Sequence, residues 1–120
     1  DMIATDHAPH SAEEKAKGLE KSAFGVVGIE TALPILYTYL VKPGILSMER
    51  LVELLVINPR ERFGIALGCD YSIWDLEEEY AVDPAEFVSM GKATPFTGTK
   101  LFGKCLMTVC DGNIVWQENQ

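Results

Sequence analysis

The sequence has few basic residues, few cysteines, few histidines and no long apolar run, and several of these scarcities exclude a class of function. Its 120 residues include 10 Lys and Arg against 18 Asp and Glu, a formal net charge of −8. Nucleic acids and anionic membrane surfaces are bound by clustered basic side chains, so this balance argues against both partners. It does not exclude a small anionic ligand, which needs only one local positive site.

The sequence has three cysteines, Cys69, Cys105 and Cys110, and none of them form a CxxC pair. Because their number is odd, at least one thiol would have no disulfide partner within the chain. This pattern argues against a disulfide framework and a zinc knuckle, and we expect a cytoplasmic protein. No apolar run approaches the ~20 residues of a membrane span, and no signal-peptide pattern opens the chain. The first residue is Asp1 rather than methionine, so we expect a segment of a longer protein.

What the sequence does have is an ordinary globular balance, with 48% hydrophobic and 23% charged residues. That balance suits one domain with a core. The length is about half that of a (β/α)8 barrel, at roughly 250 residues. The period of the apolar residues changes near residue 68, from helical spacing to alternation, which indicates a helical part followed by a small β unit.

The N-terminal residues predict a strand and a short helix. The apolar run 2–5 is typical of a buried parallel strand, which would end at Asp6. Ser11 and Glu14 fit a capping box, so a helix of about two turns should follow and end near Gly18.

Two longer helices are predicted by apolar residues at helical spacing, over about 30–41 and 47–57, on the outer side of that strand. Pro34 is tolerated only in the first turn of the first helix. Pro59 should break the second helix, because a residue before proline avoids the helical region. One more helical turn could follow the break and end at Gly64.

The C-terminal part predicts β structure over 71–76 and 105–116, in a separate small sheet. Asp111-Gly112 is a strong hairpin signal. The acidic run 77–79 predicts a solvated edge or loop. Both tryptophans of these patterns are expected in the core, at positions Trp74 and Trp116.

The densest chemistry lies in residues 5–10, Thr-Asp-His-Ala-Pro-His. A polar side chain at the carboxyl end of a barrel strand points into the active-site mouth. Asp6 could there ligate a divalent metal and exchange protons with water. His10 could donate a hydrogen bond or a charge to an anionic substrate. The residue types alone leave a plainer alternative open, in which Asp6 caps a turn and both histidines lie on the surface.

Several blocks of the sequence resemble the C-terminal part of dihydroorotases of the bacterial type, in the amidohydrolase superfamily. The blocks are residues 3–10, 13–15, 24–31, 58–64 and 94–98. The resemblance implies an α/β fold that is the C-terminal part of a metal-dependent-hydrolase (β/α)8 barrel followed by part of a small β-sandwich-like domain. Residues 1–66 would hold the last strand, active-site loops and terminal helices of the barrel, and 67–120 the small β segment.

The resemblance also implies an activity. Dihydroorotases reversibly cyclise N-carbamoyl-L-aspartate to L-dihydroorotate in pyrimidine biosynthesis, using one or two zinc ions. Asp6 would be the metal-side residue that accepts a proton from the hydrolytic water and delivers it to the leaving nitrogen. His10 and the backbone of Phe24 and Gly25 would bind the substrate. His7 has no such role in the family pattern, and we take it as structural.

The family's other metal ligands lie upstream, and the two histidines of this sequence cannot replace them. We therefore expect the isolated 120-residue segment to be inactive and to bind no zinc tightly. Two alternatives stay open: another cyclic amidohydrolase, such as a hydantoinase or allantoinase, or a non-catalytic structural partner of aspartate transcarbamoylase. Expected partners are the substrate, the remainder of the barrel, further copies in a homo-oligomer and aspartate transcarbamoylase.

Overall fold

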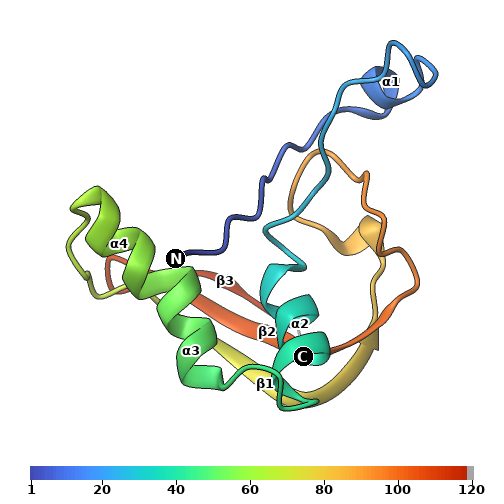
Figure 1. Ribbon diagram of the computed structural model, residues 1–120. Helices are drawn as coiled ribbons and strands as arrows, with labels where there is room; N and C mark the ends of the chain where they lie inside the picture. The colour runs from blue at the N-terminus through green and yellow to red at the C-terminus, as the bar shows by residue number, and fades with distance from the viewer. Residues whose placement is uncertain (119–120) are drawn as a thin grey trace.

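The chain is a mixed α/β structure in which helical segments lie beside a three-stranded sheet (Figure 1). The computed structural model describes residues 1–118. The helical elements before the sheet are α1 (Ala12–Lys15), α2 (Ala32–Leu36), the π-helical η1 (Tyr37–Val41), α3 (Met48–Val52), the π-helical η2 (Glu53–Ile57) and α4 (Asn58–Phe63). They are followed by β1 (Tyr71–Ala81), the 3-10 turn η3 (Pro84–Glu86), β2 (Lys100–Cys110) and β3 (Asn113–Gln117).

The capping box predicted for α1 is present. The Ser11 Oγ accepts the N–H of Glu14 at 3.2 Å, and the Glu14 carboxylate accepts the N–H of Ser11 at 2.9 Å. These hydrogen bonds lower the pKa of Glu14. The helix ends at Lys15, short of the predicted stop near Gly18. The Glu14 carbonyl, which would accept the Gly18 N–H in a longer helix, accepts the Ala23 N–H at 3.3 Å instead.

The two longer helices are confirmed, with Pro34 in the first turn of α2. The prediction that Pro59 breaks the second helix is wrong, since α3, η2 and α4 follow one another without a gap. In η2 the Asn58 N–H reaches back to the Glu53 carbonyl, and Pro59 lies at the start of α4, where its missing N–H is tolerated. Gly64 ends α4 in the left-handed conformation, with φ 65°.

The strand predicted over residues 2–5 is wrong within the described chain. The Ile3 N–H donates to the Leu54 carbonyl at 3.0 Å, and the Asn58 side chain donates to the Asp1 carbonyl at 2.7 Å. The segment therefore lies along the helix formed by η2 and α4. A strand is defined by a hydrogen-bond ladder to a neighbouring strand, and residues 1–118 place a helix beside this segment instead.

The predicted β structure is confirmed as an antiparallel sheet in the order β1-β2-β3. Tyr71 lies opposite Val109, and β2 begins already at Lys100 rather than near residue 105. Asp111 and Gly112 join β2 to β3 with φ values of 48° and 76°, the geometry of a two-residue hairpin turn. The sheet therefore extends farther along the chain than its alternating pattern indicates.

The acidic run 77–79 lies on β1, at an edge of this sheet, as predicted. It coincides with an irregularity in the pairing between Asp75 and Glu79. The Asp75 carboxylate accepts the N–H groups of Glu77 and Glu78, at 2.8 and 3.1 Å, in place of ladder partners. The bulge thus keeps the charged side chains on an edge without ending the strand.

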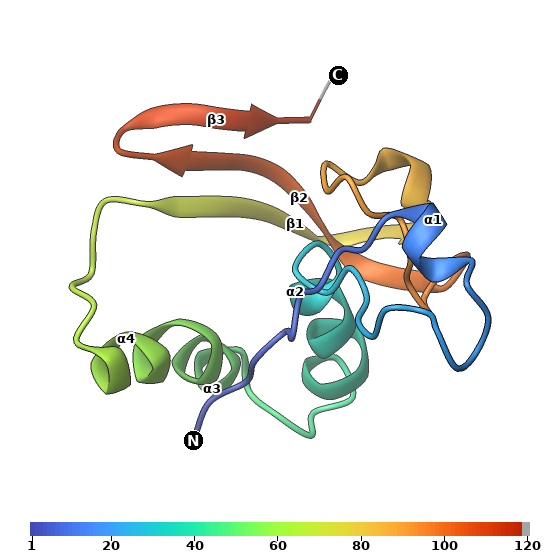
Figure 2. The same cartoon turned by 90° about the horizontal axis from the view of Figure 1, so that it is seen from above.

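Strand β2 joins the sheet to the helices. The Phe102 N–H donates to the Thr38 hydroxyl at 2.8 Å, and the Lys42 ammonium lies 3.4 Å from the centre of the Phe102 ring. Gly103, where β2 passes Pro34 of α2, has φ 97°, a conformation that favours glycine. Figure 2 shows α2 beneath the curved strands. Residues on either side of the predicted boundary at 66 are thus in contact, and the division into two domains stays a prediction.

Few hydrophobic side chains are buried within residues 1–118: Val27, Leu51, Val82, Leu101 and Val109. Large apolar side chains lie almost fully exposed around α1 and the loop beside it. Leu19 is 97% exposed, Phe24 90% and Met90 97%. Within the same residues, no helix is both long enough and apolar enough to cross a membrane.

Lys104 of β2 forms ion pairs with β1 and with the residue that follows β3. Its ammonium pairs with Glu78 of β1 at 3.2 Å and with Glu118, the residue after β3. The hydrogen bond to Glu118, followed by that to Glu78, raises the pKa of Lys104. The raised pKa means that this contribution to stability is complete at neutral pH and is lost only as the pH rises through the pKa of the folded state, above the ordinary 10.5.

We expect Lys104→Met to lower the free energy of unfolding by about 0.5–1.5 kcal/mol at low salt, because two carboxylates lose their shared partner. Lys100→Met is the matched control on the same strand. Its ammonium pairs only with Glu79 among the described residues and is 72% exposed, against 31% for Lys104. Urea denaturation of the intact protein at low and high salt measures both variants. Equal losses for the two would contradict the bridging role.

Candidate functional site

Residues 5–8 and 25–29 lie side by side and form the centre of the candidate site. His7 and Val26 make an isolated parallel bridge, and the Ala8 N–H donates to the Val26 carbonyl at 2.9 Å. This contact brings the segment of Asp6 and His10 against the loop of Phe24 and Gly25. The two predicted halves of the site are therefore adjacent.

His7 fastens this contact. Its Nδ1 accepts hydrogen bonds from the N–H groups of Gly28 and Ile29, both at 3.2 Å. A neutral imidazole accepts at one nitrogen and donates at the other, so in this arrangement the ring proton is on Nε2. These two bonds agree with the structural role predicted for His7.

Two glycines allow the backbones to approach. Gly25 has φ 122°, and a Cβ atom there would lie 2.3 Å from the Ala8 Cβ. A Cβ atom at Gly28 would lie 2.6 Å from the Thr5 carbonyl oxygen. Any side chain at either position would push the two segments apart, so the close contact requires glycine at both.

Asp6 occupies a special backbone conformation. Its φ is 48°, in the left-handed region that aspartate and asparagine adopt more readily than most residues. The residue is exposed. Within residues 1–118, no three His, Cys, Asp or Glu side chains lie close enough to hold a metal ion. By donor chemistry, the Asp6 carboxylate could serve as one oxygen ligand of a metal ion.

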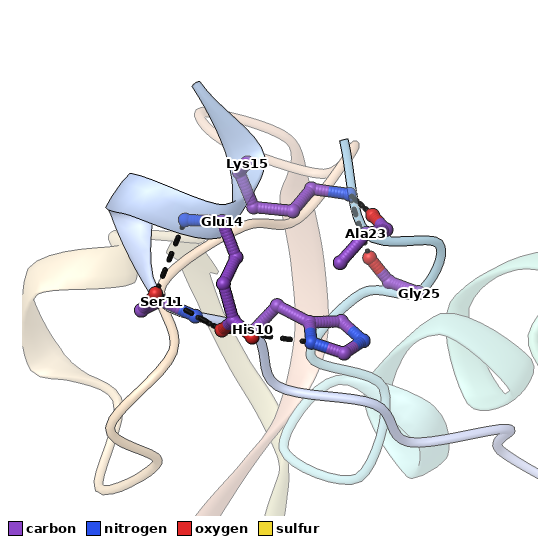
Figure 3. A network of polar contacts seen from close by, with 6 residues as sticks. All are labelled: His10, Ser11, Glu14, Lys15, Ala23 and Gly25. Atoms are coloured by element: carbon purple, nitrogen blue, oxygen red, sulfur yellow. Dashed lines mark hydrogen bonds and ion pairs between the residues drawn. The ribbon is translucent and has the colours of Figure 1, made fainter. Parts of the chain in front are cut away.

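His10 lies beside α1 (Figure 3). Its Nδ1 is 3.7 Å from a carboxylate oxygen of Glu14, and its side chain is 32% exposed. The same oxygen accepts hydrogen bonds from the N–H and the hydroxyl of Ser11, both at 2.9 Å. The capping box of α1 therefore holds the carboxylate next to His10.

Lys15 is a residue of this region that sequence analysis missed. Its ammonium donates to the carbonyl oxygens of Ala23 and Gly25, at 2.9 and 3.0 Å, on either side of Phe24 (Figure 3). The one available signal was its place in the block 13–15 that resembles dihydroorotases. Its contacts join residues eight and ten positions apart and follow from no local pattern.

A third segment supports the loop from the other side, and sequence analysis missed this as well. The Val27 N–H donates to the Ala93 carbonyl at 2.8 Å. The carboxylate of Glu30 accepts the N–H groups of Val88 and Ser89, at 2.8 and 2.9 Å. The loop is thus held between residues 5–8 and residues 88–93.

An apolar pocket of about 460 Å³ lies next to this region, between the sheet and residues 86–89. Trp74 and Trp116, predicted to lie in the core, are half-buried and line it. Cys105 lines it too, and burial raises the pKa of that thiol. None of the four predicted site residues is among the lining residues of this pocket.

The four residues predicted to act in catalysis or binding thus lie on two adjoining segments. Asp6 and His10 come from residues 5–10, and Phe24 and Gly25 from the loop that packs against them. Asp6 and Phe24 are exposed, while His10 and Gly25 are half-buried. An exposed carboxylate, a partly exposed imidazole and a backbone loop together can bind an anion and exchange a proton.

Comparison with known proteins supports the resemblance seen in the sequence. No family model matches the chain. Curated dihydroorotases from Bacillus thuringiensis (strain Al Hakam) and Bacillus cereus (strain AH187) are each 50% identical to it over 98% of its length. The matched part is a C-terminal segment of these relatives, and the chain spans 29% of their length. The resemblance to a C-terminal segment of dihydroorotases is confirmed.

Solved structures of related enzymes have the same fold over this chain. The L-hydantoinase (dihydropyrimidinase) from Arthrobacter aurescens is 32% identical, with a TM-score of 0.86 over 100% of this chain and 29% of its own. The dihydropyrimidinase from Brevibacillus agri has a TM-score of 0.87 over 97% of this chain and 28% of its own. At 21% identity, the second likeness concerns the fold alone.

We expect Gly25→Ala to lower the free energy of unfolding by about 2–4 kcal/mol, because the new methyl group meets Ala8 and the backbone resists φ 122°. Gly18→Ala is the matched control. Gly18 also has a positive φ, 79°, but no atom lies within 4 Å of its Cβ position, so a loss of about 1 kcal/mol is expected. Urea denaturation of the intact protein compares them, and equal losses would refute the close packing.

Proposed function

We propose that this chain is the C-terminal segment of a dihydroorotase, and that the whole protein interconverts N-carbamoyl-L-aspartate and L-dihydroorotate. The observation that carries the proposal is 50% identity to curated dihydroorotases over 98% of the chain. The finer architecture is part of the proposal: residues 1–66 would complete a (β/α)8 barrel, and 67–120 would belong to a small β domain. Turnover of L-dihydroorotate by the full-length protein tests it.

In this proposal Asp6 is the catalytic base and acid. In the hydrolytic direction, its carboxylate accepts a proton from the attacking water as oxygen bonds to the ring carbonyl carbon. The carbon–nitrogen bond then breaks, and the same group returns the proton to the departing nitrogen. Asp6 is then an ionised carboxylate again, and ring closure follows the same steps in reverse. The exposed carboxylate and its fixed backbone at φ 48° support this role.

His10 and the loop at Phe24 and Gly25 would bind the anionic substrate. An imidazole can donate a hydrogen bond to a carboxylate, and backbone N–H groups can donate others. These donors lie on segments that the His7 bonds hold together. They would fix the ring relative to Asp6, so that its scissile amide faces the proton carrier.

Zinc, bound through Asp6 and through ligands outside this chain, would supply Lewis-acid chemistry to the amide. One carboxylate is fewer than the three protein ligands usual for a catalytic zinc. We accordingly propose that this chain by itself has neither tight zinc binding nor activity. A cytoplasmic location, a homo-oligomer and association with aspartate transcarbamoylase are further proposals that follow from the family alone.

A hydantoinase is the second candidate function, favoured by the 32% identity to the Arthrobacter aurescens enzyme. The higher identity to dihydroorotases, 50%, places it second. Turnover of hydantoin or dihydrouracil without turnover of dihydroorotate would reverse that order. A protein that processes none of these substrates would support the non-catalytic alternative.

Asp6→Asn should lower kcat by about 10²–10⁴-fold in the intact protein, because an amide cannot carry the proton. The fold should be retained, since asparagine adopts a positive φ as readily as aspartate. Asp1→Asn, which removes the same charge from an exposed neighbouring residue, is the control. Steady-state kinetics with dihydroorotate and thermal melting measure both effects. Normal turnover by Asp6→Asn would remove this residue from the mechanism.

His10→Ala should lower kcat/KM for dihydroorotate by roughly one to three orders of magnitude, because a charge-assisted contact to the substrate is lost. Melting should change little, since the side chain is partly exposed and its contact with the exposed Glu14 carboxylate, at 3.7 Å, is longer than a hydrogen bond. His10→Asn, which keeps a donor, should fall between the wild type and His10→Ala. Kinetics of His10→Ala equal to those of the wild type would refute the binding role.

A further inference from the structure

Helix α1 and the loop 22–25 are joined by an unusual set of hydrogen bonds. The Ser22 hydroxyl donates to the Lys15 carbonyl at 2.7 Å, and the Ala23 N–H donates to the Glu14 carbonyl at 3.3 Å. The Lys15 ammonium then reaches over to the carbonyls of Ala23 and Gly25. The loop therefore has contacts to both the backbone and the side chain at the end of this short helix.

The charge of Lys15 is directed at backbone oxygens. Among residues 1–118 it forms no salt bridge, although the chain has an excess of carboxylates. Its side chain is partly buried, and the two carbonyls it binds, at 2.9 and 3.0 Å, lie on either side of Phe24. Hydrogen bonds to an ionised donor are about twice as strong as neutral ones, so this contact holds the loop firmly.

These two bonds orient the peptide groups of the loop. In a trans peptide the N–H points opposite to the C=O. The Ala23 carbonyl points to Lys15, so the Phe24 N–H, in the same peptide group, points away from it. The peptide that carries the Gly25 N–H lies between two peptides that Lys15 holds. Neither N–H donates to another residue within 1–118, so both are free to meet a ligand.

We propose that Lys15 is a positioning residue for substrate binding, acting through the loop it holds. It fixes the peptide groups around Phe24 so that their N–H donors face the anionic substrate, and it strengthens those donors by polarising the carbonyls. Without the ammonium, the loop would be less ordered before the substrate binds. Ordering it on binding would then reduce the net free energy of substrate binding. This inference rests on the proposed function, since it takes the Phe24 and Gly25 backbone as the substrate-binding surface.

Three variants of the intact protein test this role. Lys15→Met removes the charge but keeps an unbranched apolar chain. Lys15→Arg restores a cation with several donors. Lys21→Met is the matched control, because it removes one positive charge at an exposed position directly before the loop, and the Lys21 side chain makes no hydrogen bond among the described residues. It reports the effect of net charge alone on an anionic substrate.

With dihydroorotate as substrate, we expect Lys15→Met to raise KM by about 10- to 100-fold while kcat stays within about 3-fold of the wild type. Lys15→Arg should restore KM to within about 5-fold, and Lys21→Met should change it by less than about 3-fold. A fall in kcat without a rise in KM, or equal KM values for Lys15→Met and Lys21→Met, would overturn the inference.

A second measurement does not depend on activity. Hydrogen exchange of the amides in residues 23–26 should accelerate by at least about tenfold in Lys15→Met, and not in Lys21→Met or Lys15→Arg. Should the wild type fail to process dihydroorotate, the proposed function fails, while this exchange still tests whether Lys15 holds the loop. Unchanged exchange in Lys15→Met would overturn the positioning role even in an active enzyme.

Discussion

The close approach of two backbone segments, 5–8 and 25–29, is the constraint on which the rest of the site depends. Gly25 and Gly28 remove the Cβ atoms that would collide with Ala8 and Thr5. His7 then accepts two N–H groups that would otherwise lack a partner at the contact. Asp6 lies within the first of these segments and His10 two residues after it, so their positions relative to the loop follow from this contact.

The region is held by directed polar contacts more than by apolar burial. Val27 is the one fully buried hydrophobic side chain that the described residues contribute here, while Phe24 and Leu19 are exposed. A carboxylate, an imidazole and an ammonium, those of Glu30, His7 and Lys15, each bind two backbone groups. Such contacts fix direction as well as distance, which a site that aligns donors with a planar substrate requires.

Local signals predicted local structure well. The capping box of Ser11 and Glu14 and the Asp111-Gly112 turn depend on residues at most three positions apart, and both are present. The helix break predicted at Pro59 was wrong because the preceding residue, Asn58, stays helical and donates its N–H to the Glu53 carbonyl, five residues back. The prediction for residues 2–5 was wrong because an apolar run indicates burial but not the element against which it packs. That element is η2, whose Leu54 carbonyl accepts the Ile3 N–H. Lys15 and Glu30 act on residues 8–59 positions away, beyond the reach of any periodicity. The candidate site itself came from resemblance, since residue types alone left a surface role open.

The contact of Glu30 with Val88 and Ser89, and of Val27 with Ala93, also sets an order of events during synthesis. Both join the loop to residues more than fifty positions later in the chain. The helices and the His7 contact involve only residues up to 63, so they can form before the segment 88–93, which closes the loop from its other side, has been synthesised. The loop is therefore completed late in synthesis, after β1 has been made.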